Sequence, residues 1–137
     1  MVLKDVVFDP VVARIQGKAD SLKEIKRFPK TGIEGWLKVE VVAALGKNII
    51  KLKNRGPDLI LENDLRIELK AATDLNVAGI IQGGALKYKC PCLFLGDGND
   101  PRKIEAFGKD PRITLIDHVV VSDGKNKWVL GIIEPKI

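Results

Sequence analysis

Three residues near the centre of the chain combine acidic and basic side chains at a spacing that suits metal-dependent chemistry. Asp58 heads one apolar run, and Glu68 and Lys70 lie within the next. Side chains on a β-strand alternate between its faces, so Glu68 and Lys70 must share a face. If the two runs pair as strands, Asp58 comes close to Glu68, and neighbouring carboxylates repel each other unless one is protonated or a cation lies between them. Mg²⁺ prefers such a partial cage of carboxylate oxygens, and Mn²⁺ could take its place.

Whether Asp58 reaches Glu68 depends on how the strands predicted at 58–62 and 65–72 pair. In an antiparallel pair, the two side chains share a face only if opposed residue numbers add up to an even value. That condition requires a loop with an odd number of residues around Asn63–Asp64, or a β-bulge. A regular two-residue turn would put Asp58 on the opposite face and leave an ordinary ion pair on a solvated strand.

Hydrophobic periodicity predicts the elements that position these residues. We expect an N-terminal helix over 10–27, with Pro10 in its first turn, and a second helix from about Ile33 to Leu45 that stops at Gly46. The later elements are strands 48–53, 58–62 and 65–72, a helix capped by Asp74 or Asn76 and reaching about Tyr88, strand 92–95, a short helix over 102–107, and strands 113–121 and 127–133. This order implies an α/β fold, a mixed β-sheet flanked by helices, with a C-terminal β-hairpin at 113–133.

The composition is that of one folded domain, 1–137. The chain is 45% hydrophobic and 30% charged, which is too apolar for a disordered chain and sufficient for a core. No apolar stretch approaches the roughly 20 residues of a membrane span, and the N-terminus lacks the apolar core of a signal peptide. We therefore expect a cytoplasmic protein with no membrane partner. The net charge of +5, from 23 Lys and Arg against 18 Asp and Glu, favours a polyanionic partner without requiring one.

The other residues with metal-binding or nucleophilic side chains do not form a second site in the sequence. Cys90 and Cys92 are separated only by Pro91 in and before a predicted strand, and a mutual disulfide between residues this close on an extended chain is strained and unfavourable. We expect two buried thiols. His118 lies far away and has no nucleophile beside it, so we interpret it as structural.

The motif around Asp58 resembles the signature of the PD-(D/E)xK nuclease superfamily, which includes restriction endonucleases and archaeal Holliday-junction resolvases. The resemblance rests on Pro57, Asp58, Glu68 and Lys70. The predicted order of helix, three strands, helix and strand across about 32–95 also agrees. The resemblance implies a restriction endonuclease-like core and a Mg²⁺-dependent DNA endonuclease.

Members of this superfamily often carry a further glutamate on the helix before the first core strand, and Glu34 and Glu40 are the candidates here. On a helical wheel, Glu34 falls within the apolar face near Val41 and Leu45, whereas Glu40 lies at its flank. We therefore prefer Glu34, and Glu40 stays open as the alternative. Glu34 could also simply favour the positive N-terminus of the helix.

The resemblance implies a division of labour. Asp58, Glu68 and the Leu69 carbonyl would hold Mg²⁺, and Glu34 would complete the shell directly or through water. Lys70 would orient or activate the attacking water and offset charge in the transition state.

Four residues are candidates for contacts with DNA: Lys53, Arg55, Gln82 and Lys89. The first two end a basic run, 47–55, that could follow the phosphate backbone and could equally be a solvated edge. The other two share one flank of the helix after the motif, where plain polar residues are also expected. The Gly83–Gly84 pair lacks the lysine and the spacing of a phosphate-binding loop.

A rival hypothesis is a nuclease-like fold that binds nucleic acid or protein without catalysis, because a shared fold does not imply a shared activity. The sequence leaves restriction cleavage, junction resolution and repair nicking open. A small enzyme that cuts both strands commonly uses two-fold symmetry, so we expect a homodimer or a partner protein.

Overall fold

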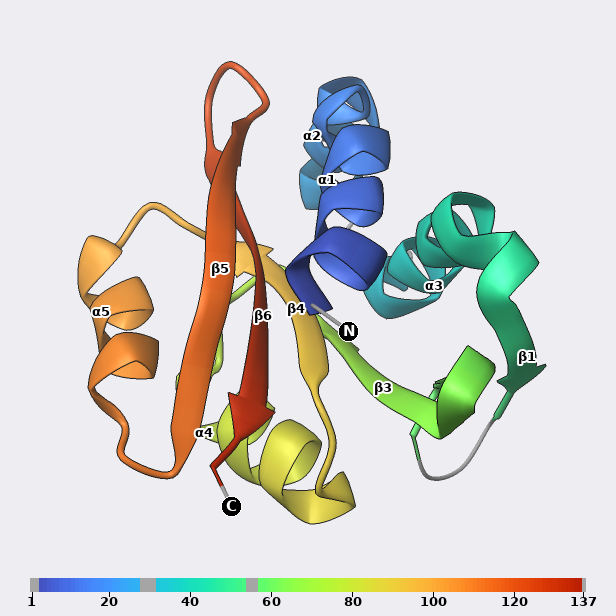
Figure 1. The fold of residues 1–137 in the computed structure, drawn as a ribbon. Coiled ribbons are helices and arrows are strands. Elements are labelled where there is room, and N and C mark those ends of the chain that lie inside the picture. Colours follow the sequence, from blue (N-terminus) through green and yellow to red (C-terminus); the bar gives the residue numbers. More distant parts are fainter. Residues whose placement is uncertain (1–2, 28–31, 54–56, 137) are drawn as a thin grey trace.

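The chain folds into a mixed sheet with helices on both faces. The computed structural model describes residues 3–27, 32–53 and 57–136. Its six strands are ordered β1-β2-β3-β4-β6-β5 (Figure 1). The α/β class and the mixed, helix-flanked sheet are therefore confirmed.

The predicted strands are present, with ends shifted by one or two residues in most cases. They are β1 (Ile49–Leu52), β2 (Leu59–Leu61), β3 (Leu65–Ala71), β4 (Cys92–Asp97), β5 (Ile113–Ser122) and β6 (Lys127–Pro135). β3 and β4 are parallel, and the other neighbouring pairs are antiparallel. The predicted terminal hairpin is confirmed, but it is no separate unit, because β6 pairs with β4 and extends the central sheet.

The prediction of one continuous N-terminal helix over 10–27 is wrong, because the helix is interrupted. The chain forms a π-helical turn, η1 (Lys4–Phe8), followed by α1 (Asp9–Gln16) and α2 (Ala19–Arg27). The break falls at Gly17, which is a poor helix former. Pro10 lies in the first turn of α1, as expected. None of the helices described in the structure has the length and hydropathy needed to span a membrane.

The prediction that Glu34 lies on the buried face of the second helix is wrong. α3 spans Ile33–Leu45 as expected, but Glu34 is exposed and Glu40 is buried. Glu40 accepts a hydrogen bond of 2.7 Å from Nε of Arg14 on α1. The helical wheel gave the wrong buried face because α3 packs on a neighbouring helix as well as on the sheet. A buried carboxylate is tolerated where a guanidinium pairs with it.

The crossover between β3 and β4 consists of α4 (Val77–Ile80) and the π-helical η5 (Ile81–Leu86). Asn76 caps it by accepting a hydrogen bond from the Gly79 amide at 3.0 Å, which confirms Asn76 over Asp74 as the cap. The predicted short helix is α5 (Pro101–Lys109), capped by the Asp100 side chain.

Each face of the sheet carries its own cluster of buried apolar side chains. Helices η1, α1, α2 and α3 cover one face, where Ile67, Leu69 and Leu93 are buried. The crossover helices and α5 cover the other, which buries Cys92 and Phe94. In Figure 1, α3 lies above β3 and α4 lies below it, and α5 lies beside β5 at one end of the sheet. Glu68 and Lys70 belong to the α4 side, because their neighbours on β4 are Cys92 and Phe94.

Candidate active site

The register of β2 and β3 brings Asp58 to Glu68. Leu59 pairs with Ile67 and Leu61 with Leu65, and the connection is the three-residue turn η4 (Glu62–Asp64). The odd loop that the parity argument required is therefore confirmed. Extending the register by one residue places Asp58 opposite Glu68, on the same face.

Both carboxylates converge on one backbone amide. The Leu69 N–H donates to Oδ2 of Asp58 at 2.9 Å and to Oε1 of Glu68 at 3.3 Å. On the other side, the Asp58 carbonyl accepts from the Lys53 amide at 2.9 Å, which ties Asp58 to β1. Because the N–H and C=O of a strand residue point to the same side, the Leu69 carbonyl also faces this edge. The two carboxylates expected from the sequence therefore lie together on one strand face.

Glu68 is held in a place that disfavours its negative charge. The residue is buried, with only 4% of its surface exposed. Burial, a side-chain hydrogen bond with Asp58 and the negative charge of Asp58 raise the pKa of Glu68 to about 8, against the opposing effect of Lys70 and the Leu69 amide. The raised pKa means that the negative charge of Glu68 is unfavourable here, and a cation placed beside the carboxylate would offset that charge.

This raised pKa predicts how stability depends on pH without divalent ions. Between about pH 4.5, the ordinary value for glutamate, and about pH 8, the folded chain binds the Glu68 proton more tightly than the unfolded chain does. The free energy of unfolding should therefore fall as the pH rises through this window. Urea denaturation in EDTA measures the slope, and Glu68→Gln should remove this contribution.

The same experiment with saturating Mg²⁺ should abolish or reverse the Glu68 contribution, because a bound cation favours the ionised carboxylate. An identical pH slope in the wild type and in Glu68→Gln would contradict the assignment of the raised pKa to this residue.

Lys70 shares the face of Glu68 and lies under the crossover helix. A Cβ added at Gly84 would lie 2.8 Å from Sγ of Cys92 and 3.5 Å from Cγ of Lys70. Gly84 thus lets η5 approach β3 and β4 closely, whereas a Cβ added at Gly83 would meet nothing within 4 Å. The sequence offered only the unusual Gly83–Gly84 pair as a signal for this.

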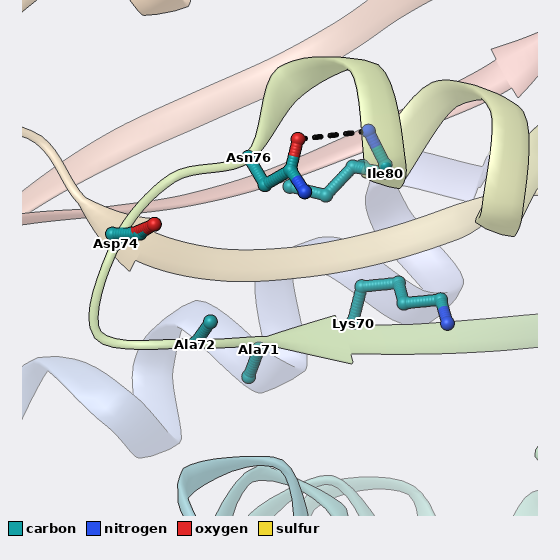
Figure 2. A pocket seen from close by; sticks show the side chains of 7 residues that line it. Lys70, Ala71, Ala72, Asp74, Asn76 and Ile80 are labelled. Atoms are coloured by element: carbon teal, nitrogen blue, oxygen red, sulfur yellow. Dashed lines mark hydrogen bonds between the residues drawn. The ribbon is translucent and has the colours of Figure 1, made fainter. Parts of the chain in front are cut away.

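A cavity of about 200 Å³ lies at the end of β3 and is lined by Lys70, Ala71, Ala72, Asp74, Asn76, Gly79 and Ile80. Figure 2 shows the Lys70 amine pointing away from Asp74, back along β3. Asp58 and Glu68 are not part of the lining. Lys70 is a lining residue of this cavity, and its charge also acts on Glu68, where it lowers the pKa of the carboxyl group.

The two cysteines are free and buried, as expected. Cys92 is the neighbour of Glu68 on β4. Burial raises the pKa of the Cys90 thiol to about 11 and that of Cys92 well above its ordinary value, and the charge of Glu68 adds to both effects. They are protonated thiols that line the acidic site, a proximity that their spacing in sequence could not reveal.

Neither helical glutamate joins Asp58 and Glu68. Across residues 3–27, 32–53 and 57–136, no group of three or more His, Cys, Asp or Glu side chains is arranged to hold a metal ion. The residue that α3 directs at the site is Lys38, whose Nζ lies 3.7 Å from Oδ1 of Asp58. Lys38 was not among the site residues predicted from the sequence, although it lies about one turn after Glu34 on the same side of the helix.

Glu34→Gln should therefore leave the affinity for Mn²⁺ unchanged within about twofold, as expected for an exposed side chain. Glu40→Gln should instead lower the free energy of unfolding by about 1–2 kcal/mol, because it weakens a charge-assisted hydrogen bond to Arg14. Isothermal titration and urea denaturation of both variants check the two outcomes. A large loss of Mn²⁺ affinity in Glu34→Gln would restore it as a ligand.

The predicted DNA-contact residues have different surroundings. Lys53 is half-buried, and Gln82 and Lys89 are exposed. Arg55 lies outside the described residues. The basic run does not form one regular strand face, because Lys47 precedes β1 and the register of β1 shifts between Ile49 and Lys51.

His118 lies at the other end of the sheet and is exposed, and its interpretation as a structural residue stays a prediction. It lines a groove of about 610 Å³ between α5 and β5, together with Ile104, Glu105, Leu115, Val120 and Lys127 among others. The register shift between Leu115 and Asp117 turns His118 and Val120 toward this side. On the row of paired residues that crosses the sheet, Phe94 and Gly131 separate His118 from Lys70.

Comparison with known proteins adds no family assignment. No protein-family model matches the sequence, and no curated protein or solved structure matches it significantly.

Proposed function

We propose that this protein is a metal-dependent DNA endonuclease with a restriction endonuclease-like core of the PD-(D/E)xK type. The observation that carries the proposal is the convergence of Asp58 and Glu68 on the Leu69 amide. Two carboxylates in contact, one of them buried with a pKa of about 8, form a site that a divalent cation would stabilise. The order of elements through β4 is consistent with the same proposal.

Each residue has a distinct role in the proposed reaction. Asp58, Glu68 and the Leu69 carbonyl would hold Mg²⁺ or Mn²⁺, as hard oxygen donors. The ion supplies Lewis-acid polarisation of the scissile phosphate and lowers the pKa of water. Lys70 carries a positive charge on the same strand face, where it would position the attacking water and offset negative charge that develops on the phosphate.

The surroundings of the site suit a polyanion. The chain carries a net charge of +5, and Lys53 and Lys38 lie on the β1 and α3 side of Asp58. Gln82 and Lys89 are exposed on the crossover side. We propose that these residues contact the DNA backbone, which positions the substrate without reading its sequence.

The proposal is tested by a cleavage screen with linear, nicked, branched and single-stranded DNA in Mg²⁺ or Mn²⁺, with EDTA as the control. We expect cleavage of at least one substrate that is abolished by EDTA. Comparison of the substrates identifies the DNA structure that is preferred. Absence of cleavage from all four, in either metal, would contradict the proposed activity.

A binding module without catalysis is the second candidate, and one observation favours it. Lys38 and Lys70 already bring positive charge to the two carboxylates, so the site has counterions without a metal. Titration with Mn²⁺ separates the candidates, because a binding module would show no saturable metal site at Asp58 and Glu68.

A further inference from the structure

The ammonium group of Lys38 lies beside Oδ1 of Asp58, the carboxylate oxygen that a bound metal ion would need. Oδ2 of Asp58 accepts from the Leu69 amide at 2.9 Å, whereas Oδ1 lies 3.7 Å from Nζ of Lys38. At that distance the contact is an ion pair without a hydrogen bond. Nζ donates instead to the Lys53 carbonyl at 3.1 Å. The ammonium is therefore held beside Asp58 by a group that is not itself charged.

The helix provides this lysine with room to move. Lys38 follows the buried Leu37 on α3 and sits at the edge of the buried face. Its stem borders an open, mostly apolar groove of about 310 Å³ with Gly35, Val39, Val42 and Leu52. A long aliphatic stem on an apolar surface can redirect its charged end at little cost. The two side chains of the ion pair are 28% and 22% exposed, so the pair is accessible to ions from solvent.

We propose that Lys38 is the internal counterion of Asp58 in the metal-free protein, and that metal binding releases its ammonium to a backbone phosphate of the nucleic acid. This inference rests on the proposed function, because it assigns a regulation to the same site. A cation that approaches Oδ1 of Asp58 meets the like charge of Lys38, so the two compete. The released ammonium lies next to the site at which a phosphate is expected, and phosphate is its natural partner.

The competition predicts that removing the charge improves metal binding. Lys38→Met keeps a stem of similar length and should bind Mn²⁺ about tenfold more tightly than the wild type, because one like charge is lost from the site. Lys47→Met is the matched control: it removes an exposed lysine on η3 (Gly46–Asn48) and should leave Mn²⁺ affinity unchanged. Electron paramagnetic resonance of free Mn²⁺ measures both without any need for activity. Lys38→Gln, with a thermal melt of each variant, guards against a folding defect.

The second arm measures binding to a short DNA duplex in Ca²⁺ and in EDTA. Lys38→Met should weaken binding in Ca²⁺ and lower the salt slope by about 1, but it should match the wild type in EDTA, where Lys38 is paired with Asp58. Equal Mn²⁺ affinity in the wild type, Lys38→Met and Lys38→Gln would overturn the inference and leave the proposed metal site intact. Absence of Mn²⁺ binding in all three would overturn the proposed function and the inference with it.

Discussion

Replacing Asp58 by asparagine or Lys70 by methionine should abolish Mg²⁺-dependent cleavage of DNA while the fold is retained. Asparagine keeps an oxygen that can accept from the Leu69 amide, which now donates to Oδ2 at 2.9 Å, but it removes the negative charge that would hold the cation. Methionine keeps the stem of Lys70 beneath Gly84 and removes the charge. Loss of one electrostatic contributor of this kind lowers kcat by roughly 100- to 1000-fold.

The stability of the Asp58 variant separates a catalytic role from a structural one. Because the charge of Asp58 opposes ionisation of Glu68, Asp58→Asn should match or exceed the wild type in thermal stability in EDTA. Lys109→Met, an exposed lysine at the end of α5, removes the same charge as Lys70→Met far from the site and should cleave normally. Normal cleavage by Asp58→Asn or Lys70→Met would refute the assignment of the active site.

The second large effect is expected at Gly131, next to the core of the α4 face. A Cβ at this position would collide with Cζ of Phe94 and lie 2.8 Å from Cε1 of the same ring. The ring of Phe94 cannot move aside, because it is fully buried and stacks on Phe107 with 4.4 Å between the ring centroids. Gly131→Ala should lower the free energy of unfolding by about 2–3 kcal/mol, as overpacking of a core does. For a domain of this size, the midpoint of thermal unfolding should fall by roughly 10 °C.

Two further variants show whether the ring is the cause. Gly108→Ala on α5 meets nothing within 4 Å and should be neutral or stabilising by up to about 1 kcal/mol, because alanine favours a helix. Phe94→Leu shortens the side chain that obstructs the new methyl group. The double variant Phe94→Leu/Gly131→Ala should therefore be more stable than the sum of the single effects predicts. Strict additivity would exclude the contact with Phe94 as the source of the loss.

The acidic pair and the Phe94–Gly131 contact lie on the same face of the sheet but are built differently. The carboxylate site tolerates repulsion between Asp58 and Glu68, which opposes folding as the pH rises. The row beside it, from Phe94 to Gly131, is packed without spare volume. A closely packed row beside the acidic pair would help to hold the proposed metal ligands in a fixed geometry.

Much of the site could be predicted from local pattern. Alternation along β3 places Glu68 and Lys70 on one face whatever the strand pairs with, because it is a property of the extended backbone itself. The strands β1 to β6 and a helix cap at Asp74 or Asn76 follow from short-range rules of the same kind. The sequence also reduced the pairing of Asp58 with Glu68 to a single question, the parity of one loop.

Other features depend on neighbours that a local pattern cannot identify. The wheel of α3 favoured Glu34, but contact with α1 buries Glu40 against Arg14 instead. The N-terminal helix is broken at Gly17 into α1 and α2, which both bury apolar side chains in the same core cluster. Lys38 and Cys92 come from elements distant in sequence and meet the acidic pair only in the folded sheet.

The sequence by itself therefore determined that an acid and a base share one strand face, with a second acid one strand earlier. The tertiary structure decided that Asp58 meets Glu68, through the three-residue turn η4, and that a lysine of α3 rather than a glutamate faces them. The physical reason is the sequence separation over which each interaction acts. Side-chain alternation arises within one strand, whereas strand register and helix orientation depend on the packing of several elements that are distant in sequence.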